Sequence, residues 1–213
     1  MKTSKAQIIR EYGPFPGVKD VAGVTYDGEK VWFAAGDKLH ALDPESGQTG
    51  RSIEVAAHAG TAFDGKHFYQ IAEKVIQKID AKSGKVLGTI PSPGGGKDSG
   101  MAWAEGSLWV GVYRDKKIHQ VDPLTGKILR SIESNKFVTG VTWVDGELWH
   151  ATWEGDSELR HIDANTGEVL ETLEMPKGAE VSGLESNGKD RFFCGGGGTG
   201  KVRAVRKPGK VAG

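Results

Sequence analysis

The chain has 213 residues, and its 28 lysines and arginines balance its 28 aspartates and glutamates. A neutral chain lacks the positive charge that draws proteins to nucleic-acid phosphates, so we expect no nucleic-acid partner. The sequence has no apolar run long enough to span a membrane, no signal-peptide pattern, and one cysteine, Cys194. We therefore expect no disulfide, no membrane contact and a cytoplasmic location.

The first element in the chain is a β-strand predicted for residues 6–12. The segment AQIIREYGPFPG, which contains it, resembles GKVLGTIPSPG from Gly84 and GKILRSIESN from Gly126. Each of these later segments ends a repeated unit. We therefore expect residues 6–12 to supply the fourth strand of a unit that lacks its own.

A motif then recurs five times: a glycine, a short β-rich run, a tight turn and an apolar–aromatic pair. Its copies are 37, 40, 40 and 43 residues apart and begin at Gly23, Gly60, Gly100, Gly140 and Gly183. A second motif, D-x-x-[ST]-G, follows in the first four copies and begins at Asp43, Asp80, Asp122 and Asp163. Both motifs supply residues typical of hairpin turns, so each copy predicts four short strands, with only three in the last.

Units of about 40 residues with four strands are the signature of a β-propeller. We expect an all-β fold, with one domain over 1–213 and five four-stranded blades, closed by the N-terminal strand in the last blade. An open stack of repeats is the alternative, and it would leave both edges unpaired. The blades are predicted at 18–55, 56–92, 96–133, 136–175, and 181–207 plus 6–12.

Aromatic residues recur in two columns that we interpret as core between blades. The first column contains Tyr26, Phe63, Trp103 and Trp143, and the second contains Trp32, Phe68, Trp109, Trp149 and Phe192.

Residues that break the repeat are the candidate site residues. In a propeller, the loops into the first strands and those between the second and third strands meet at the channel mouth, where function concentrates. Trp153 and Tyr113 stand there in place of Gly36 and Ala72. Two aromatic rings beside charged residues suit a small planar or charged ligand. The alternative is that they only close blade 3 onto blade 4.

We predict that Trp153, Tyr113 and Arg114 hold the ligand. Gln70 and His150 are further substrate-binding candidates, because other units have small or apolar residues in their places; a core histidine is the alternative for His150. Proton transfer is assigned to Glu154, His58 and Asp98, whose side-chain chemistry suits it.

Carboxylates on several of these loops suggest a cation site. Asp20, Asp98 and Glu180 are the predicted metal ligands, since calcium and magnesium prefer oxygen donors. Solvated surface charge is the alternative.

Two segments carry a family resemblance. GELWHATWEGDSELRHIDANTGEVL from Gly146 and HFYQIA from His67 resemble the plant and bacterial glutamine cyclotransferases (glutaminyl cyclases). The resemblance implies a five-bladed propeller that closes N-terminal glutamine into pyroglutamate, with Trp153 and Asp156 matching family positions. Ala59 stands where that family has its catalytic glutamate. GVTYDGEKVWFAAG from Gly23 is also similar to streptogramin-lyase-type propellers.

We therefore expect a glutamine-cyclotransferase-like propeller that binds a small molecule or a peptide end at its channel mouth. Whether acid–base catalysis follows stays open, because Ala59 removes the acid that the resemblance implies. The alternative is a non-catalytic scaffold that binds a protein partner through its rim.

Overall fold

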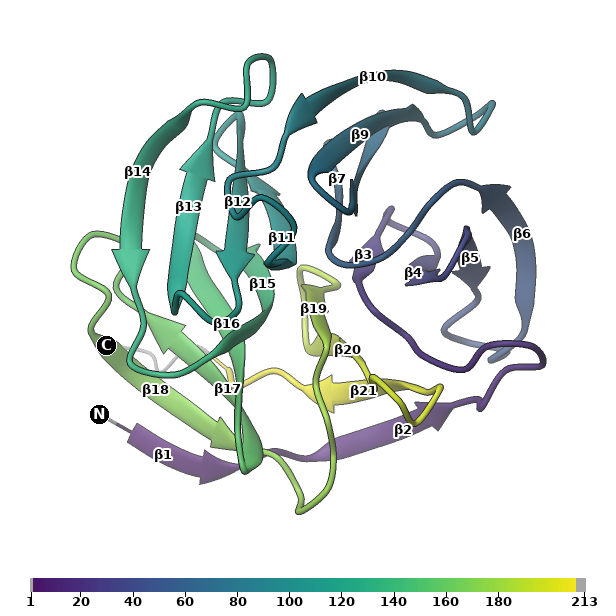
Figure 1. The fold of residues 1–213 in the computed structure, drawn as a ribbon. Helices are drawn as coiled ribbons and strands as arrows, with labels where there is room; N and C mark the ends of the chain where they lie inside the picture. Colours follow the sequence, from purple (N-terminus) through teal and green to yellow (C-terminus); the bar gives the residue numbers. More distant parts are fainter. Residues whose placement is uncertain (1, 210–213) are drawn as a thin grey trace.

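A computed structural model describes residues 2–209, and their strands form five sheets around a common axis (Figure 1). Each sheet has four antiparallel strands, and one sheet carries an additional strand at its outer edge. Residues 2–209 contain no α-helix, and so none that could cross a membrane. The predicted all-β, five-bladed β-propeller is confirmed.

In every blade the strands run from the axis to the rim. Blades 1 to 3 contain β3 (Val24–Tyr26), β4 (Val31–Ala35), β5 (Lys38–Leu42) and β6 (Thr49–Glu54); β7 (Thr61–Phe63), β8 (His67–Ala72), β9 (Val75–Asp80) and β10 (Val86–Pro91); and β11 (Asp98–Ala104), β12 (Ser107–Val112), β13 (Lys117–Val121) and β14 (Ile128–Glu133). Blades 4 and 5 contain β15 (Val138–Val144), β16 (Glu147–Glu154), β17 (Asp156–Ile162) and β18 (Val169–Glu174); and β19 (Gly183–Ser186), β20 (Arg191–Gly195), β21 (Val202–Arg206) and β2 (Ile8–Tyr12).

Aspartate side chains shape the hairpin turns. In the second motif of blade 1, Asp43 Oδ1 accepts hydrogen bonds from the backbone nitrogens of Glu45 at 2.8 Å and Ser46 at 2.9 Å. Gly47 then takes a φ of 79°, a conformation that glycine adopts without strain. The same turn recurs in the other three copies of the motif, at Asp80, Asp122 and Asp163.

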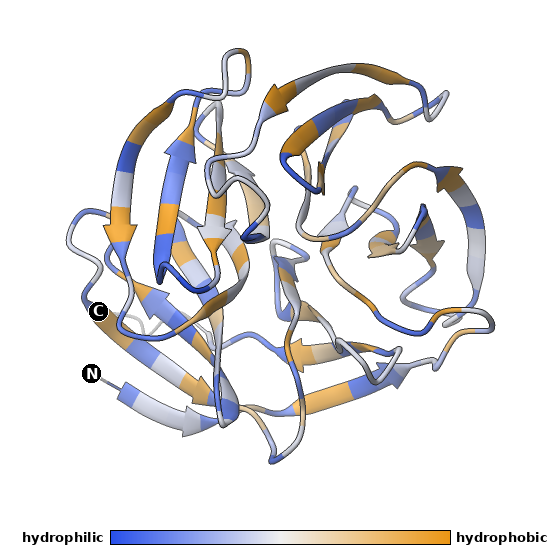
Figure 2. Ribbon diagram, in the orientation of Figure 1, coloured by the Kyte–Doolittle hydropathy of each residue, from blue (hydrophilic) through white to orange (hydrophobic). Residues whose placement is uncertain are grey.

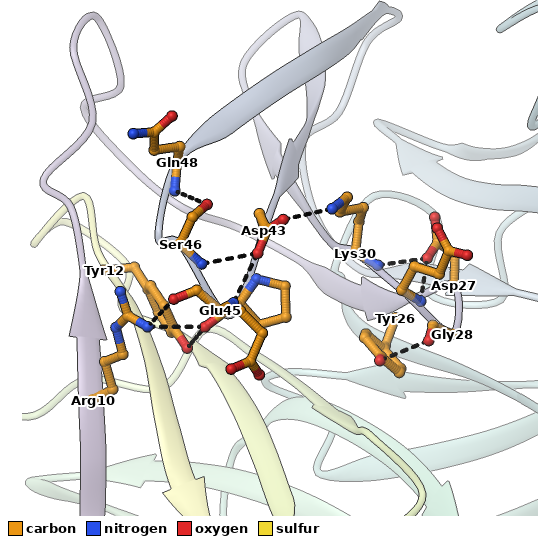
Figure 3. Close-up of polar contacts among 12 residues, drawn as sticks. Arg10, Tyr12, Tyr26, Asp27, Gly28, Lys30, Asp43, Glu45, Ser46 and Gln48 are labelled. Carbon is orange, nitrogen blue, oxygen red and sulfur yellow. Dashed lines mark hydrogen bonds and ion pairs between the residues drawn. The ribbon is translucent and has the colours of Figure 1, made fainter.

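The N-terminal strand closes the ring as predicted. β2 pairs antiparallel with β21 and completes blade 5. Its side chains also reach blade 1, because Tyr12 Oη donates a 2.8 Å hydrogen bond to the Pro44 carbonyl and Arg10 Nη1 donates to the carbonyls of Pro44 and Glu45 (Figure 3). The closing strand therefore joins the last blade to the first.

Residues before β2 form a strand that the repeats do not predict. β1 (Lys2–Lys5) pairs in parallel with β18 and extends blade 4 at its rim (Figure 1). Lys2 forms an ion pair with Glu171 at 2.8 Å, and Lys5 forms one with Glu174. Residues 2–12 thus span the outer edges of two neighbouring blades.

The core lies between the blades, because apolar and polar residues alternate along strands such as β13 (Figure 2). The ladder corrects one predicted column. Tyr69 and Phe193 pair with the innermost strands as Trp32, Trp109 and Trp149 do, so they take the places that we assigned to Phe68 and Phe192. Phe68 and Phe192 are also buried, against Trp32 and Trp149.

The five motif glycines let the innermost strands approach one another. A Cβ atom on Gly60 or Gly100 would lie 2.5 Å from a backbone nitrogen of the next blade. Similar clashes would arise at Gly23, Gly140 and Gly183. Any side chain there would push the blades apart, which explains why a glycine opens each copy of the motif.

Candidate functional site

A small cavity lies between blades 4 and 5. It has a volume of ≈ 210 Å³ and is lined by Thr139, Trp153, Glu180, Val181 and Ser182. Thr139 lies near the start of β15, and residues 180–182 directly precede β19. Since β15 and β19 are innermost strands, the cavity lies where two of them begin, beside the axis (Figure 1). We call it the mouth pocket.

One wall of the mouth pocket is aromatic and carries a hydroxyl group without a partner. Trp153 lies near the end of β16 and is 45% exposed, whereas Trp32, Trp109 and Trp149 are buried. Thr139 is 9% exposed, and its hydroxyl has no hydrogen-bond partner among the described residues. An exposed indole next to an unsatisfied hydroxyl is a feature of binding sites more than of packing.

The opposite wall is held by the glycine-rich loop between β20 and β21. The backbone nitrogen of Gly198 donates to Glu180 Oε2 at 3.2 Å, and the nitrogen of Gly197 donates to the Ser182 hydroxyl at 3.1 Å. Arg203 Nη1 supports the same wall by donating to the Glu180 carbonyl at 3.0 Å. The Glu180 carboxylate is therefore oriented at the pocket while its side chain stays exposed to solvent.

A second carboxylate lies close to this wall. A Cβ atom on Gly198 would be 3.4 Å from Asp20 Oδ1 and 4.0 Å from Glu180 Oε2. The two carboxylates thus flank the same short loop and make this edge of the pocket negative.

The predicted ligand-binding residues Tyr113 and Arg114 lie at the neighbouring junction, between blades 3 and 4. The Tyr113 ring packs on Phe137 with centroids 4.8 Å apart, and burial raises the pKa of its hydroxyl. The Arg114 side chain is exposed. Of the residues that we predicted to hold the ligand, only Trp153 lines the mouth pocket.

The three predicted proton-transfer residues are not brought together. Glu154 forms a 2.7 Å ion pair with Lys116, which lowers the pKa of the carboxyl group. Asp98 accepts hydrogen bonds from the backbone nitrogens of Gly94 and Gly96, so it shapes its own loop. His58 is exposed on the loop into blade 2. No hydrogen bond or ion pair among residues 2–209 joins any two of them.

Gln70 and His150 are interior residues. Gln70 is fully buried, and its amide bonds to Thr61 Oγ1 and to the carbonyls of Ala59 and Ile71. His150 is 1% exposed, and burial lowers the pKa of its imidazole to about 4. Both share one ladder position with the buried Cys194, so this column belongs to the core.

The predicted metal ligands do not assemble. Asp20 and Glu180 approach the same loop, but Asp98 caps the separate loop at 94–96. Within residues 2–209, no three histidine, cysteine, aspartate or glutamate side chains are grouped closely enough to hold a metal ion. A divalent cation therefore has no oxygen-rich cage in this part of the chain.

A larger hollow of ≈ 500 Å³ lies over blade 1, between residues 16–20 and 35–40. Its charged lining combines Lys19 and Lys38 with Asp20 and Asp37. Because these charges are of both signs and no exposed aromatic ring lines it, the hollow selects no class of ligand as clearly as the mouth pocket does.

Sequence reasoning missed one acidic residue on the axis. Glu185 lies on β19, where the other copies of the motif have Thr25, Ala62, Ala102 and Thr142. Its carboxylate accepts hydrogen bonds from Thr25 at 3.0 Å and Thr142 at 2.5 Å. The signal was available in the aligned repeats, because an acid replaces a small residue in this column.

Comparisons with known proteins agree with this architecture. The family described as Domain of unknown function (DUF5074) matches residues 45–195. The crystal structure of Myxococcus xanthus glutaminyl cyclase is similar with a TM-score of 0.80, covering 96% of this chain and 97% of that chain at 18% identity. The WD40 β-propeller domain of Doa1 has a TM-score of 0.57, covering 88% and 63% at 15% identity. No curated protein matches the sequence. At these identities, the structural similarity shows the fold alone.

Proposed function

Because the chain belongs to the DUF5074 family of domains of unknown function, we propose its function from the geometry of its site: it binds the ammonium group of a small molecule or of a peptide amino terminus in the mouth pocket. The observation that carries this proposal is the exposed Trp153 indole facing a pocket that also contains the Glu180 carboxylate.

The chemistry of the lining favours a cation. The face of an indole attracts ammonium groups, and a carboxylate adds a charged partner. Asp20 lies near the same edge, and no lysine or arginine side chain lines the pocket. The unpartnered Thr139 hydroxyl supplies a further polar group that a ligand can use.

The size of the pocket limits what enters it. A volume of ≈ 210 Å³ is smaller than the roughly 300–1,000 Å³ typical of drug-sized ligands. It suits the end of a longer molecule, with the remainder in solvent. A peptide amino terminus has this form, and a glutaminyl terminus is one member of the class.

Acid–base catalysis is a separate proposal that the same peptides test. Glu154, His58 and Asp98 remain its candidate residues, although they do not converge. Cyclisation of an N-terminal glutamine releases ammonia, whereas binding alone does not. Ammonia release that falls in Glu154→Gln, Asp98→Asn or His58→Ala would support a catalytic role, and binding without ammonia would support a binding module.

Calorimetric titration tests the binding proposal. Glutaminyl and alanyl peptides with a free amino terminus should bind, and their N-acetylated forms should not. Trp153→Ala and Glu180→Gln should each weaken binding roughly tenfold or more, since a desolvated cation–π contact is worth ~1–2 kcal/mol. Glu133→Gln, at an exposed glutamate on β14, is the matched control and should bind as the unchanged protein does. Equal binding of acetylated and free peptides would contradict the proposal.

A further inference from the structure

A carboxyl group is enclosed at the axis by hydroxyl groups from two other blades. Glu185 Oε1 accepts hydrogen bonds from Thr142 Oγ1 at 2.5 Å and from the Ser186 backbone nitrogen at 2.8 Å. Its Oε2 lies 3.0 Å from Thr25 Oγ1. Thr25 belongs to blade 1, Thr142 to blade 4 and Glu185 to blade 5. One side chain therefore links three of the five innermost strands.

No charged group compensates this carboxylate. The hydrogen bonds of Glu185 go only to Thr25, Thr142 and Ser186. The titratable and charged side chains on the strands packed against β19 are Tyr26, Asp98, Glu147, His150, Glu154, Arg191 and Cys194. None of them forms an ion pair or hydrogen bond with it, and burial raises the pKa of Glu185 to about 7.

We propose that Glu185, Thr25 and Thr142 form a proton-binding site on the propeller axis, and that its occupancy is coupled to the mouth pocket. The coupling rests on the proposed function of that pocket, whereas the proton site does not. The other two innermost strands place Ala62 and Ala102 at this level, so the site is built by blades 4, 5 and 1.

The hydrogen bonds indicate which oxygen takes up the proton. Oε1 already accepts two hydrogen bonds, so a proton from solvent is added to Oε2. The resulting O–H group donates to Thr25 Oγ1, which can accept as well as donate. Loss of the proton leaves a buried carboxylate that retains three hydrogen-bond donors but no cation, and burial without a counter-charge is costly.

The coupling follows from the two strands involved. Thr142 lies three residues after Thr139 on β15, and Glu185 lies three residues after Ser182 on the segment that enters β19. Three residues of strand span about 10 Å. The hydrogen bond between Thr142 and Glu185 therefore joins the two strands that carry both walls of the pocket, so a change in it shifts these walls relative to each other.

Carbon NMR of the Glu185 carboxyl group in the full chain tests the proton site directly. The signal is assigned by comparison with Glu185→Gln and followed from about pH 4 to pH 9, a range that spans ordinary and shifted glutamate pKa values. We expect a titration midpoint near 7. Thr142→Val and Thr25→Val should move it higher, because each removes a hydrogen bond that favours the charged form. A midpoint in the ordinary range of about 4–5 would overturn the proposal.

A stability measurement gives a second readout if the signal is broad. A carboxyl group with a raised pKa contributes stability that is complete below its unfolded pKa and is lost as the pH rises through 7. Glu185→Gln should therefore melt on the order of 5–10 °C above the unchanged protein near pH 8.5, with a smaller difference near pH 5. Thr152→Val, at a buried hydroxyl without a partner, is the matched control and should leave the pH profile unchanged. A profile that Glu185→Gln also leaves unchanged would overturn the proposal.

The coupling is tested by titrating a peptide into both proteins at about pH 6 and pH 8.5. A change in affinity of roughly fivefold or more in the unchanged protein, absent in Glu185→Gln, supports it. The same change in both proteins overturns it. If no amine binds at any pH, the proposed function and the coupling fail together, and the carbon titration still decides the proton site.

Discussion

The Tyr12 hydroxyl donates a 2.8 Å hydrogen bond to the Pro44 carbonyl, so the strand that completes blade 5 is anchored in a turn of blade 1 (Figure 3). Tyr12 is 2% exposed and packs with Phe33 and Val202, residues of the two blades that it joins. The ring is therefore closed by side chains as well as by the β2–β21 ladder.

Deleting residues 2–12 should remove this closure. We expect a loss of more than about 3 kcal/mol in the free energy of unfolding, since a buried aromatic side chain and a whole strand are lost. The exposed edge of β21 should also promote aggregation. Urea unfolding with light scattering measures both. Deleting only residues 2–5 removes β1 with its exposed ion pairs and should cost about 1 kcal/mol or less. Equal effects of the two deletions would contradict closure by β2.

Three blade junctions are held by an arginine on the outermost strand. Arg10 donates to two carbonyls of the blade 1 turn, Arg51 to those of Ala81 and Lys82, and Arg130 to that of Ala164. Gly88 occupies this ladder position in blade 2, and a groove of ≈ 170 Å³ opens there against Pro123 and Leu124 of blade 3.

Restoring an arginine should strengthen that junction. A Cβ atom on Gly88 meets nothing within 4 Å, but the neighbouring Lys78 would repel a new cation. In blade 3, Gln120 accepts a hydrogen bond from Arg130 at the equivalent place. The double variant Lys78→Gln, Gly88→Arg should therefore unfold about 1 kcal/mol later than Lys78→Gln alone in a urea titration. No gain over that single variant would show that the turn carbonyls of blade 3 do not need a partner.

His150 should make the fold sensitive to acid. Burial lowers the pKa of its imidazole from 6.5 to about 4. Its contribution to stability is complete above pH 6.5 and is lost as the pH falls towards 4. His150→Phe, which copies Phe33 of blade 1, should remove roughly 2 kcal/mol of the stability loss between pH 6.5 and pH 5. Exposed His58→Ala should keep the acid sensitivity, and a parallel profile for His150→Phe would contradict the assignment.

Much of the fold could be predicted because its determinants are local. Glycines and aspartates define the hairpins, and their recurrence counts the blades. The strand at 8–12 could be found because it resembles Gly84–Gly94. β1 could not be found, because its partner β18 is distant in the chain and the ion pairs at Glu171 and Glu174 leave no repeated pattern.

The candidate site was harder to predict, since it depends on how loops from different blades approach. Trp153 was found because it breaks a column. Glu154 and Asp98 occupy the expected loops, but Lys116 and the nitrogens of Gly94 and Gly96 engage them. Only the folded arrangement shows that Glu180 reaches the same pocket as Trp153.

The central claim, that an ammonium group binds against Trp153, is tested most directly by nitrogen–proton NMR of the six tryptophan indoles while a free-amine peptide is added. The account predicts that the Trp153 indole signal shifts first and most, that the buried Trp109 and Trp149 signals stay in place, and that the acetylated peptide has no effect. An unmoved Trp153 signal in the presence of a bound peptide would contradict it.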